Sequence, residues 1–134
     1  MTDNPRPHVL CVRAASCLVI LFLLLLFIIT QRQVKNLSLS LLPLAHSATE
    51  AVVREDWEQA RMATLRMYEN YLPYDKQLRL YMDHQDVDLL HMRLLSCKNL
   101  ARVEDEQIIV DLEELKSKLD YLANVGALKL WNLL

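Results

Sequence analysis

The feature that most constrains this chain is a long apolar block near its start. Residues 9 to 29, "VLCVRAASCLVILFLLLLFII", contain one charged residue, Arg13, in 21 positions. About 20 apolar residues in a helix are enough to cross the hydrocarbon core of a bilayer, and an arginine near one end of such a helix can extend to the interface. We therefore expect this block to be a membrane-spanning helix.

The residues on either side of the block indicate how it is used. A cleaved signal peptide has small residues shortly after its apolar core, whereas "TQRQVKN" at 30–36 is bulky and polar, which favours an uncleaved signal anchor. Arg6, Arg13 and the terminal amine lie on the N-terminal side of the block, against Arg32 and Lys35 on the other side. The positive-inside rule then leans slightly towards a cytoplasmic N-terminus. We expect a tail at 1–8, a transmembrane signal anchor at 9–29, a juxtamembrane segment at 30–46 and an extracytoplasmic helical domain at 47–134.

Composition favours helices and excludes several classes of function. The chain has one glycine and four prolines, too few to punctuate a fold of strands and turns. Cys11 and Cys17 lie within the apolar block and Cys97 stands alone in the rest, which excludes a disulfide framework there. Residues 37–134 carry 11 Lys and Arg against 16 Asp and Glu, and a net charge of −5 makes nucleic acid a poor partner.

Apolar residues beyond the block recur at steps of three and four, the period of an amphipathic helix. Such stripes need partner helices, and each run lasts only about two heptads, so an all-α antiparallel bundle is favoured over a coiled coil. Pro73 should bend or restart the first helix after about four turns. The three stripes are Trp57, Ala60, Leu65, Tyr68 and Leu72; Val87, Leu90, Leu94, Cys97 and Ala101; and Ile108, Leu112, Leu115, Leu119 and Leu122.

A faint internal repeat relates two parts of this domain. "VREDWEQA" at 53–60 resembles "RVEDEQII" at 102–109, and Leu65, Tyr71 and Leu72 align with Leu115, Tyr121 and Leu122 at an offset of about 50 residues. The natural unit of such a repeat is a helical hairpin. The expected fold is therefore a single transmembrane helix followed by a bundle of two stacked hairpins.

The stretch between the anchor and Trp57 leaves two interpretations open. "SATE" at 47–50 has the spacing of a capping box, which would start a new helix there. Leu37, Leu41 and Leu44 could instead extend the membrane helix outward. Pro43 makes one unbroken helix less favoured and still permits a kinked one.

A polar cluster could in principle form a metal site. "YMDHQDVDLLHMRLL" at 81–95 gathers two histidines and three aspartates within nine positions. If residues 84–95 form one helix, His84, Asp88 and His91 lie within about 60° of one another. Histidine and carboxylate are common zinc ligands, so this spacing permits a metal site without specifying one.

Helix capping gives the same cluster a simpler interpretation. Asp83 and Asp86 are good N-cap residues, and acids in a first turn complement the helix dipole. If Asp86 is the cap, His84 lies before the helix and its alignment disappears. His84 would then satisfy a backbone carbonyl or a carboxylate while packing on Trp57 or on the terminal segment, and its loss should matter more than that of His91. We therefore expect structural roles here, with no metal and no cofactor.

The order of these features resembles a known family. A single apolar span, "EDWEQA", "YMDHQDVD", a heptad helix after a short acidic turn and the closing "LKLWNLL" together resemble the bacterial domain-of-unknown-function 4363 family over nearly the whole chain. The resemblance implies a small single-pass protein of the bacterial cell membrane, with a helical domain outside the cytoplasm and no established activity. Pro73 and "YENYLPY" depart from the smoother helix expected there. The matching positions are Trp57, Ala60, Asp83, His84, Leu128, Leu130, Asn132 and Leu134.

No catalytic arrangement of Ser and His, Cys and His or paired carboxylates stands out in the sequence. We therefore expect no enzyme but a membrane-anchored helical interaction module that scaffolds or modulates another envelope protein. The lipid bilayer and a membrane or envelope protein are its expected partners, and a homo-oligomer is possible. The alternative is an extracytoplasmic pH or metal sensor that uses the His84 region. Structural or interaction roles are expected for Trp57, Ala60, Asp83, His84, Asp86, Asp88, His91, Leu130 and Asn132.

Overall fold

The computed structural model describes the backbone of residues 7–131 and the side chains of residues 11–80 and 82–124. These residues form four helices and no strand, which confirms the all-α prediction for this part of the chain. The helices are α1 (Pro7–Val53), α2 (Trp57–Tyr81), α3 (His84–Val103) and α4 (Ile108–Trp131). The chain divides into two units, Met1–Arg32 and Gln33–Leu134, and α1 contributes to both.

The described part of the first unit is apolar helix. The most apolar 18-residue window of α1 has a mean hydropathy of 2.8, and none of that window is buried against the rest of the chain. A segment of this length and composition suits a single-pass membrane anchor or a signal sequence.

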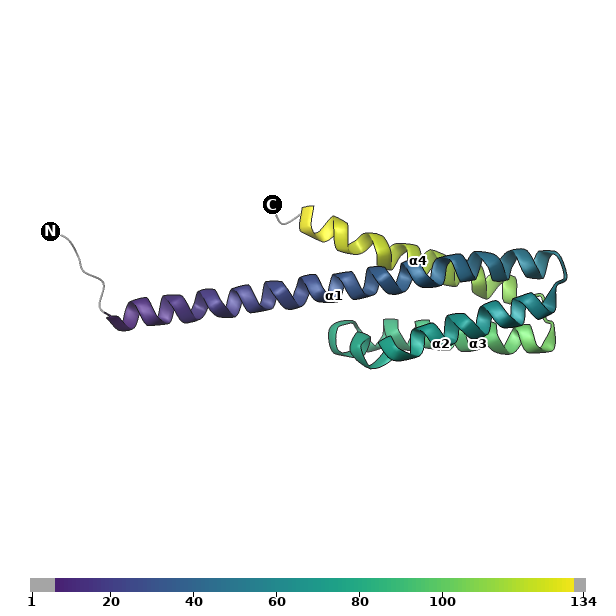
Figure 1. The fold of residues 1–134 in the computed structure, drawn as a ribbon, viewed down its shortest axis with the longest axis horizontal. Coiled ribbons are helices and arrows are strands. Elements are labelled where there is room, and N and C mark those ends of the chain that lie inside the picture. Colours follow the sequence, from purple (N-terminus) through teal and green to yellow (C-terminus); the bar gives the residue numbers. More distant parts are fainter. Residues whose placement is uncertain (1–6, 132–134) are drawn as a thin grey trace. The chain divides into compact units, whose positions relative to one another are not determined.

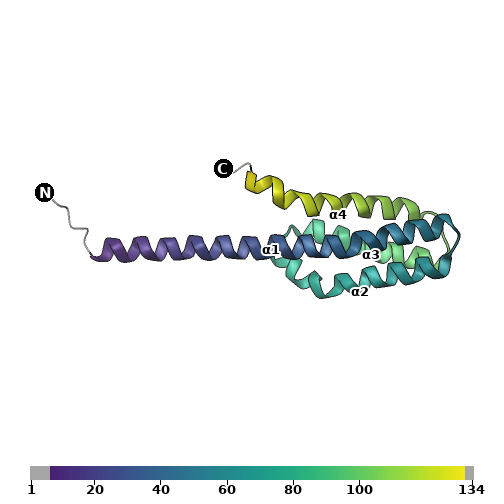
Figure 2. The ribbon, with the colours of Figure 1, turned by 45° about the horizontal axis from the view of Figure 1, so that its top comes forward.

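The second unit is a bundle whose successive helices run in opposite directions. Figure 1 and Figure 2 show the C-terminal part of α1, then α2, α3 and α4, alternating in direction and joined by short turns. This is the up-down-up-down arrangement that short connections favour. The two hairpins expected from the repeat are α1 with α2 and α3 with α4. The leading helix of the first hairpin therefore includes residues 33–46, which the sequence pattern assigned to a juxtamembrane segment.

The turns of the two hairpins have matching conformations. Glu55 and Glu104 both adopt the left-handed region, with φ of 59° and 56°. The next residue in each turn donates its backbone N–H five residues back, Asp56 to Ala51 at 2.8 Å and Asp105 to Leu100 at 3.1 Å. Each of these aspartates also accepts a hydrogen bond from a backbone N–H that follows it. The faint sequence repeat thus marks a repeated helix–turn–helix geometry.

Two prolines lie inside helices rather than at helix ends. α1 continues through Pro43, and α2 continues through Pro73 to Tyr81, so the expected restart at Pro73 is wrong. The capping box at 47–50 is also absent, since those residues lie within α1. A proline inside a helix costs about 3 kcal/mol. Burial of the residues around each proline offsets that cost, since Leu41 and Ala45 flank Pro43, and Tyr71 precedes Pro73.

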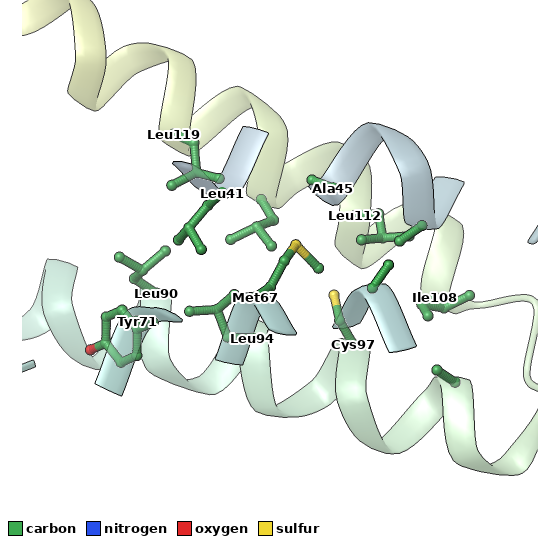
Figure 3. Close-up of a cluster of buried hydrophobic side chains, with 14 of the residues drawn as sticks. Leu41, Ala45, Met67, Tyr71, Leu90, Leu94, Cys97, Ile108, Leu112 and Leu119 are labelled. Atoms are coloured by element: carbon green, nitrogen blue, oxygen red, sulfur yellow. The ribbon is translucent and has the colours of Figure 1, made fainter. Parts of the chain in front are cut away.

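All four helices contribute to one core in the second unit. Figure 3 shows Leu41 and Ala45 of α1 facing Met67 of α2, Leu94 of α3 and side chains of α4. The bundle therefore begins at Gln33, earlier than the residue 47 expected from the sequence. The buried hydrophobic residues of α1 are Val34, Leu37, Leu41, Ala45, Ala48, Ala51 and Val52.

The core-facing side of α2 differs from the predicted stripe. Leu65 and Leu72 are 45% and 46% exposed, and Trp57 is only partly buried. The buried side chains of α2 are Ala60, Ala63, Thr64, Met67, Tyr71 and Leu78. The packed face of α2 therefore combines small residues near its start with Met67, Tyr71 and Leu78 further along. The stripe of α3 is confirmed in full, and that of α4 from Ile108 to Leu119.

Candidate functional site

A polar cluster joins α2 to α3, and the carboxylate of Asp75 lies at its centre. The Tyr71 hydroxyl donates to Asp75 Oδ1 at 2.5 Å, and Arg79 Nε donates to Asp75 Oδ2 at 3.1 Å. Steps of four residues put these three side chains on one face of α2. Arg79 Nη1 also donates to Asp88 Oδ1 of α3 at 2.6 Å, so one guanidinium connects the two helices.

His91 of α3 faces this cluster. Its ring packs edge-on against Tyr68 and Tyr71, with a centroid separation of 5.7 Å in both cases. His91 Nδ1 lies 3.8 Å from Asp75 Oδ1 and is buried with no hydrogen-bond partner among the described residues. Lys98 Nζ lies over the Tyr68 ring, 4.3 Å from its centroid.

Hydrogen bonding and burial shift two pKa values here in opposite directions. The hydrogen bond from Arg79, and then that from Tyr71, lowers the pKa of Asp75 below its ordinary value. Burial, and then the hydrogen bond to Asp75, raises the pKa of Tyr71. Asp75 is therefore held ionised and Tyr71 protonated, which makes Tyr71 a hydrogen-bond donor rather than a base or a nucleophile.

The lowered pKa of Asp75 predicts acid-dependent stability. A carboxylate whose pKa falls on folding stabilises the fold fully above its unfolded pKa and loses that contribution as pH falls through the folded pKa. We expect Asp75→Asn to lower the free energy of unfolding by about 1 kcal/mol at pH 7, and the difference from the wild type to shrink below pH 4. Urea unfolding of the detergent-solubilised chain between pH 2 and 7 measures this, with exposed Asp120→Asn as control. A difference that stays constant with pH would contradict the assignment.

A second polar network joins α3 to α4 around Asp111, whose side chain is only 8% exposed. Arg93 Nη1 donates to Asp111 Oδ1 at 2.6 Å and Ser96 Oγ donates to Oδ2 at 2.5 Å, so both carboxylate oxygens are satisfied. Arg93 also pairs with Glu114. Burial, with the charge of Asp111 nearby, raises the pKa of the Cys97 thiol to about 12. Cys97 is therefore an inert core residue rather than a nucleophile.

A groove of about 420 Å³ runs between α3 and α4 beside this network. Leu90 and Leu115 form a buried apolar floor, and Tyr121 at the rim is 59% exposed. Lys118 Nζ donates to Asp86 Oδ1 at 2.6 Å and lies 5.8 Å from the centroid of the Tyr121 ring. The groove is lined by Leu89, Leu90, Arg93, Glu114, Leu115, Ser117, Lys118 and Tyr121. Tyrosine and arginine around an apolar pocket are typical of protein-binding hot spots.

The two predicted caps of α3 have different roles. Asp83 is the N-cap, and its side chain accepts a hydrogen bond from Gln85 N at 2.8 Å. Asp86 lies in the first turn instead of capping the helix, and its side chain bonds Lys118 of α4. The acid that sequence reasoning treated as a second cap therefore ties two helices together at one end of the groove.

The two histidines of α3 differ from expectation, because His91 and not His84 makes the packed contacts. α3 begins at His84, so the helix required for the zinc interpretation exists. However, the Asp88 side chain accepts a hydrogen bond from Arg79, and the His91 ring faces Asp75. His84 is exposed, and the packed contacts belong to His91. The predicted contact between His84 and Trp57 is wrong, because the 25 residues of α2, roughly 37 Å of helix, separate them. The alternative contact, with the terminal segment, lies outside the described side chains. Within the described residues no group of three or more His, Cys, Asp or Glu is placed to hold a metal ion.

The remaining predicted residues lie away from these networks or outside the described part. Ala60 is fully buried in the core, while Trp57 is partly buried at the first position of α2. The side chain of Leu130 and the whole of Asn132 lie outside the described residues. The interaction roles expected for Leu130 and Asn132 therefore stay predictions.

Sequence reasoning missed the residues that hold the two networks together. The series Tyr71, Asp75, Arg79 was a usable signal, because steps of four place an acceptor between two donors on one helix face. Arg93 and Asp111 gave no such signal, since they are distant in the sequence and meet only when α3 packs on α4.

Comparison with known proteins gives one match. A family model described as "Domain of unknown function (DUF4363)" matches residues 28–133. No curated protein and no solved structure matches the chain significantly.

Proposed function

Because the chain belongs to the DUF4363 family, whose domain has no known function, we propose its function from its own geometry. We propose that it is a non-enzymatic, membrane-tethered helical module that binds a segment of another envelope protein in the groove between α3 and α4. The single observation that carries this proposal is the exposed Tyr121 beside the apolar floor of that groove.

The tether is the apolar part of α1, as a single-pass anchor of the bacterial cell membrane with the N-terminus in the cytoplasm and the bundle outside it. The mean hydropathy of 2.8 and the complete exposure of the most apolar window support this role. Polar, bulky residues after the block support an anchor that is retained rather than cleaved. The proposed orientation follows from the positive-inside rule applied to the residues that flank the block.

The groove suits an amphipathic helix of the partner. Leu90 and Leu115 offer apolar contact, and Tyr121 presents a large ring with few rotatable bonds. The groove lining carries charges of both signs, the positive Lys118 and the negative Glu114. A helix laid in a groove in this way is a common mode of peptide recognition. A partner helix with leucine-like anchors and charges of both signs on its flanks would be complementary.

The polar networks support a binding rather than a catalytic role. Tyr71 is kept protonated, the Cys97 thiol has a raised pKa, and Asp111 has both oxygens occupied. Side chains in these states stabilise helix contacts and leave no activated nucleophile among them. The Asp111 network joins α3 to α4, the two helices that line the groove, and a fixed spacing between them reduces the entropy cost of binding.

A photo-crosslinking experiment tests the groove. We place a benzophenone amino acid at Tyr121 in the full-length chain, illuminate intact cells and identify the adducts. The expected result is one prominent adduct with an envelope protein, because the probe would replace a side chain that contacts the partner directly.

The matched control carries the same probe at Glu113, which is exposed on the same helix but does not line the groove. Adducts at position 113 should be at least tenfold weaker. Equal labelling at both positions, or no adduct at position 121, would set the groove aside as the binding surface.

A further inference from the structure

The outer face of α3 carries a second heptad stripe, opposite the one that packs in the core. The outer positions are Gln85, Leu89, Met92, Ser96, Asn99 and Val103, at alternating steps of four and three. Leu89, Met92 and Val103 are 46%, 65% and 70% exposed. A heptad repeat of apolar side chains on an exposed helix face is the pattern by which helices pair.

The absence of charge on this stripe distinguishes it from the corresponding face of α2. There, exposed Met62, Leu65 and Leu72 are interrupted by Glu58, Glu69 and Lys76 at the same heptad spacing. The outer stripe of α3 has only Gln85, Ser96 and Asn99 between its apolar residues. A parallel pair of α2 faces would set Glu58 and Glu69 against the same residues of the second copy, and in any pairing of that face charged side chains would be buried in the seam, whereas the α3 seam has no charged side chain to bury.

The surface of α3 is also hollowed along this stripe. A groove of about 400 Å³ is lined by Met92, Leu95, Ser96, Asn99, Leu100 and Val103. A helix that pairs with another inserts each apolar side chain into a space between four side chains of its partner. Met92 and Val103, at the two ends of this hollow, are the side chains available to insert.

Charges beside the stripe complement a second copy of the same helix. Asp88 and Arg102 lie on one flank and Arg93 on the other, and the Asp88 and Arg93 side chains keep exposures of 56% and 36%. Opposite flanks meet in a parallel pair of helices, which brings Asp88 of one copy towards Arg93 of the other. Like flanks meet in an antiparallel pair, which brings Asp88 towards Arg102. An acid of one copy faces an arginine of the other in either orientation.

We infer that the outer face of α3 is a self-association surface whose occupant is α3 of a second copy of this chain, forming a two-fold symmetric dimer. Such an interface is isologous, because the same patch contributes from both subunits. Asn99 lies within the seam, where a polar residue selects helix register and the two-stranded state. Leu89 and Arg93 line both this face and the α3–α4 groove, whereas Met92 and Val103 do not line that groove, so substitutions at those two positions test self-association separately from the proposed partner.

The test is the mass of the full-length chain in detergent, measured by sedimentation with the bound detergent subtracted. We expect twice the chain mass for the wild type and for Leu80→Lys, a control that charges a 77% exposed leucine of α2. We expect a monomer for Met92→Lys combined with Val103→Lys, with at least a tenfold weaker association. Circular dichroism should show unchanged helix content and cooperative melting for the double variant, because both side chains are exposed.

Two results would overturn the inference. A wild type that sediments as a monomer at all accessible concentrations would remove the dimer. A double variant that folds and remains a dimer would place the contact elsewhere in the chain. Dissociation of the Leu80→Lys control to the same extent would count against it too, because any added positive charge would then suffice.

Discussion

A chain that begins at Ser47 should lose the cooperative unfolding transition that a chain beginning at Gln33 keeps. The shorter chain lacks Leu37 and Leu41, which are 2% and 0% exposed. Burying a leucine contributes roughly 1.5–3 kcal/mol, so these two alone contribute about 3–6 kcal/mol, comparable with the 5–15 kcal/mol that stabilises a typical domain. Urea titrations followed by circular dichroism compare the two fragments. A sharp transition of equal midpoint in both would contradict the four-helix core.

A point substitution separates lost packing from the effects of truncation. Leu41→Ala in the full-length chain should lower the free energy of unfolding by about 2–5 kcal/mol, because it leaves a cavity among all four helices. Leu39→Ala, two residues earlier and 55% exposed, is the matched control and should cost under about 0.5 kcal/mol. Equal small effects would mean that this part of α1 does not pack on the bundle.

Removing Arg93 should be the most damaging change to a charged residue. Arg93→Met leaves the buried Asp111 carboxylate with Ser96 as its remaining donor, and breaking a buried ion pair in this way costs about 3 kcal/mol. Arg102→Met, an exposed arginine of the same helix, should cost under about 0.5 kcal/mol. The measurement is again the free energy of unfolding in urea.

Adding Asp111→Leu to Arg93→Met distinguishes a charge effect from lost packing. The double variant has no buried charge to leave unpaired, so it should recover part of the loss. A loss of unfolding free energy in the double variant that exceeds the sum of the losses in the two single variants would contradict this account of the network.

Helices with large apolar residues on one face were predictable from the sequence, and those packed through small residues were not. The α3 stripe from Val87 to Ala101 is fully buried as predicted. In α2 the pattern included the buried Ala60 but also the exposed Leu65 and Leu72, and it left out the buried Ala63 and Met67. An alanine adds little to an apolar pattern, so a face that packs partly through small residues is hard to recognise in the sequence.

The start of the bundle was unpredictable for a related reason. Leu37 and Leu41 come shortly after the apolar block, separated from it only by the polar stretch at 30–36, so the sequence pattern permits them to extend the membrane helix as readily as to begin a packed face. Ala45, Ala48 and Ala51 complete that face with little hydrophobic signal. The Asp75 cluster was partly visible in its four-residue steps, but its partner His91 could be placed there only by the turn between α2 and α3.

The order of the two hairpins has a consequence for how the protein is made. α1 and α2 leave the ribosome before the roughly 50 residues that form α3 and α4, and at 5–20 residues per second that interval lasts about 3–10 s. During this time Met67 and Tyr71 of the first hairpin have no α3 or α4 to cover them. The second hairpin of a neighbouring nascent chain presents the same core residues that would later cover this face, so it can pair with the uncovered first hairpin. Newly made copies on one polysome are therefore exposed to hairpin exchange before each chain completes its own core.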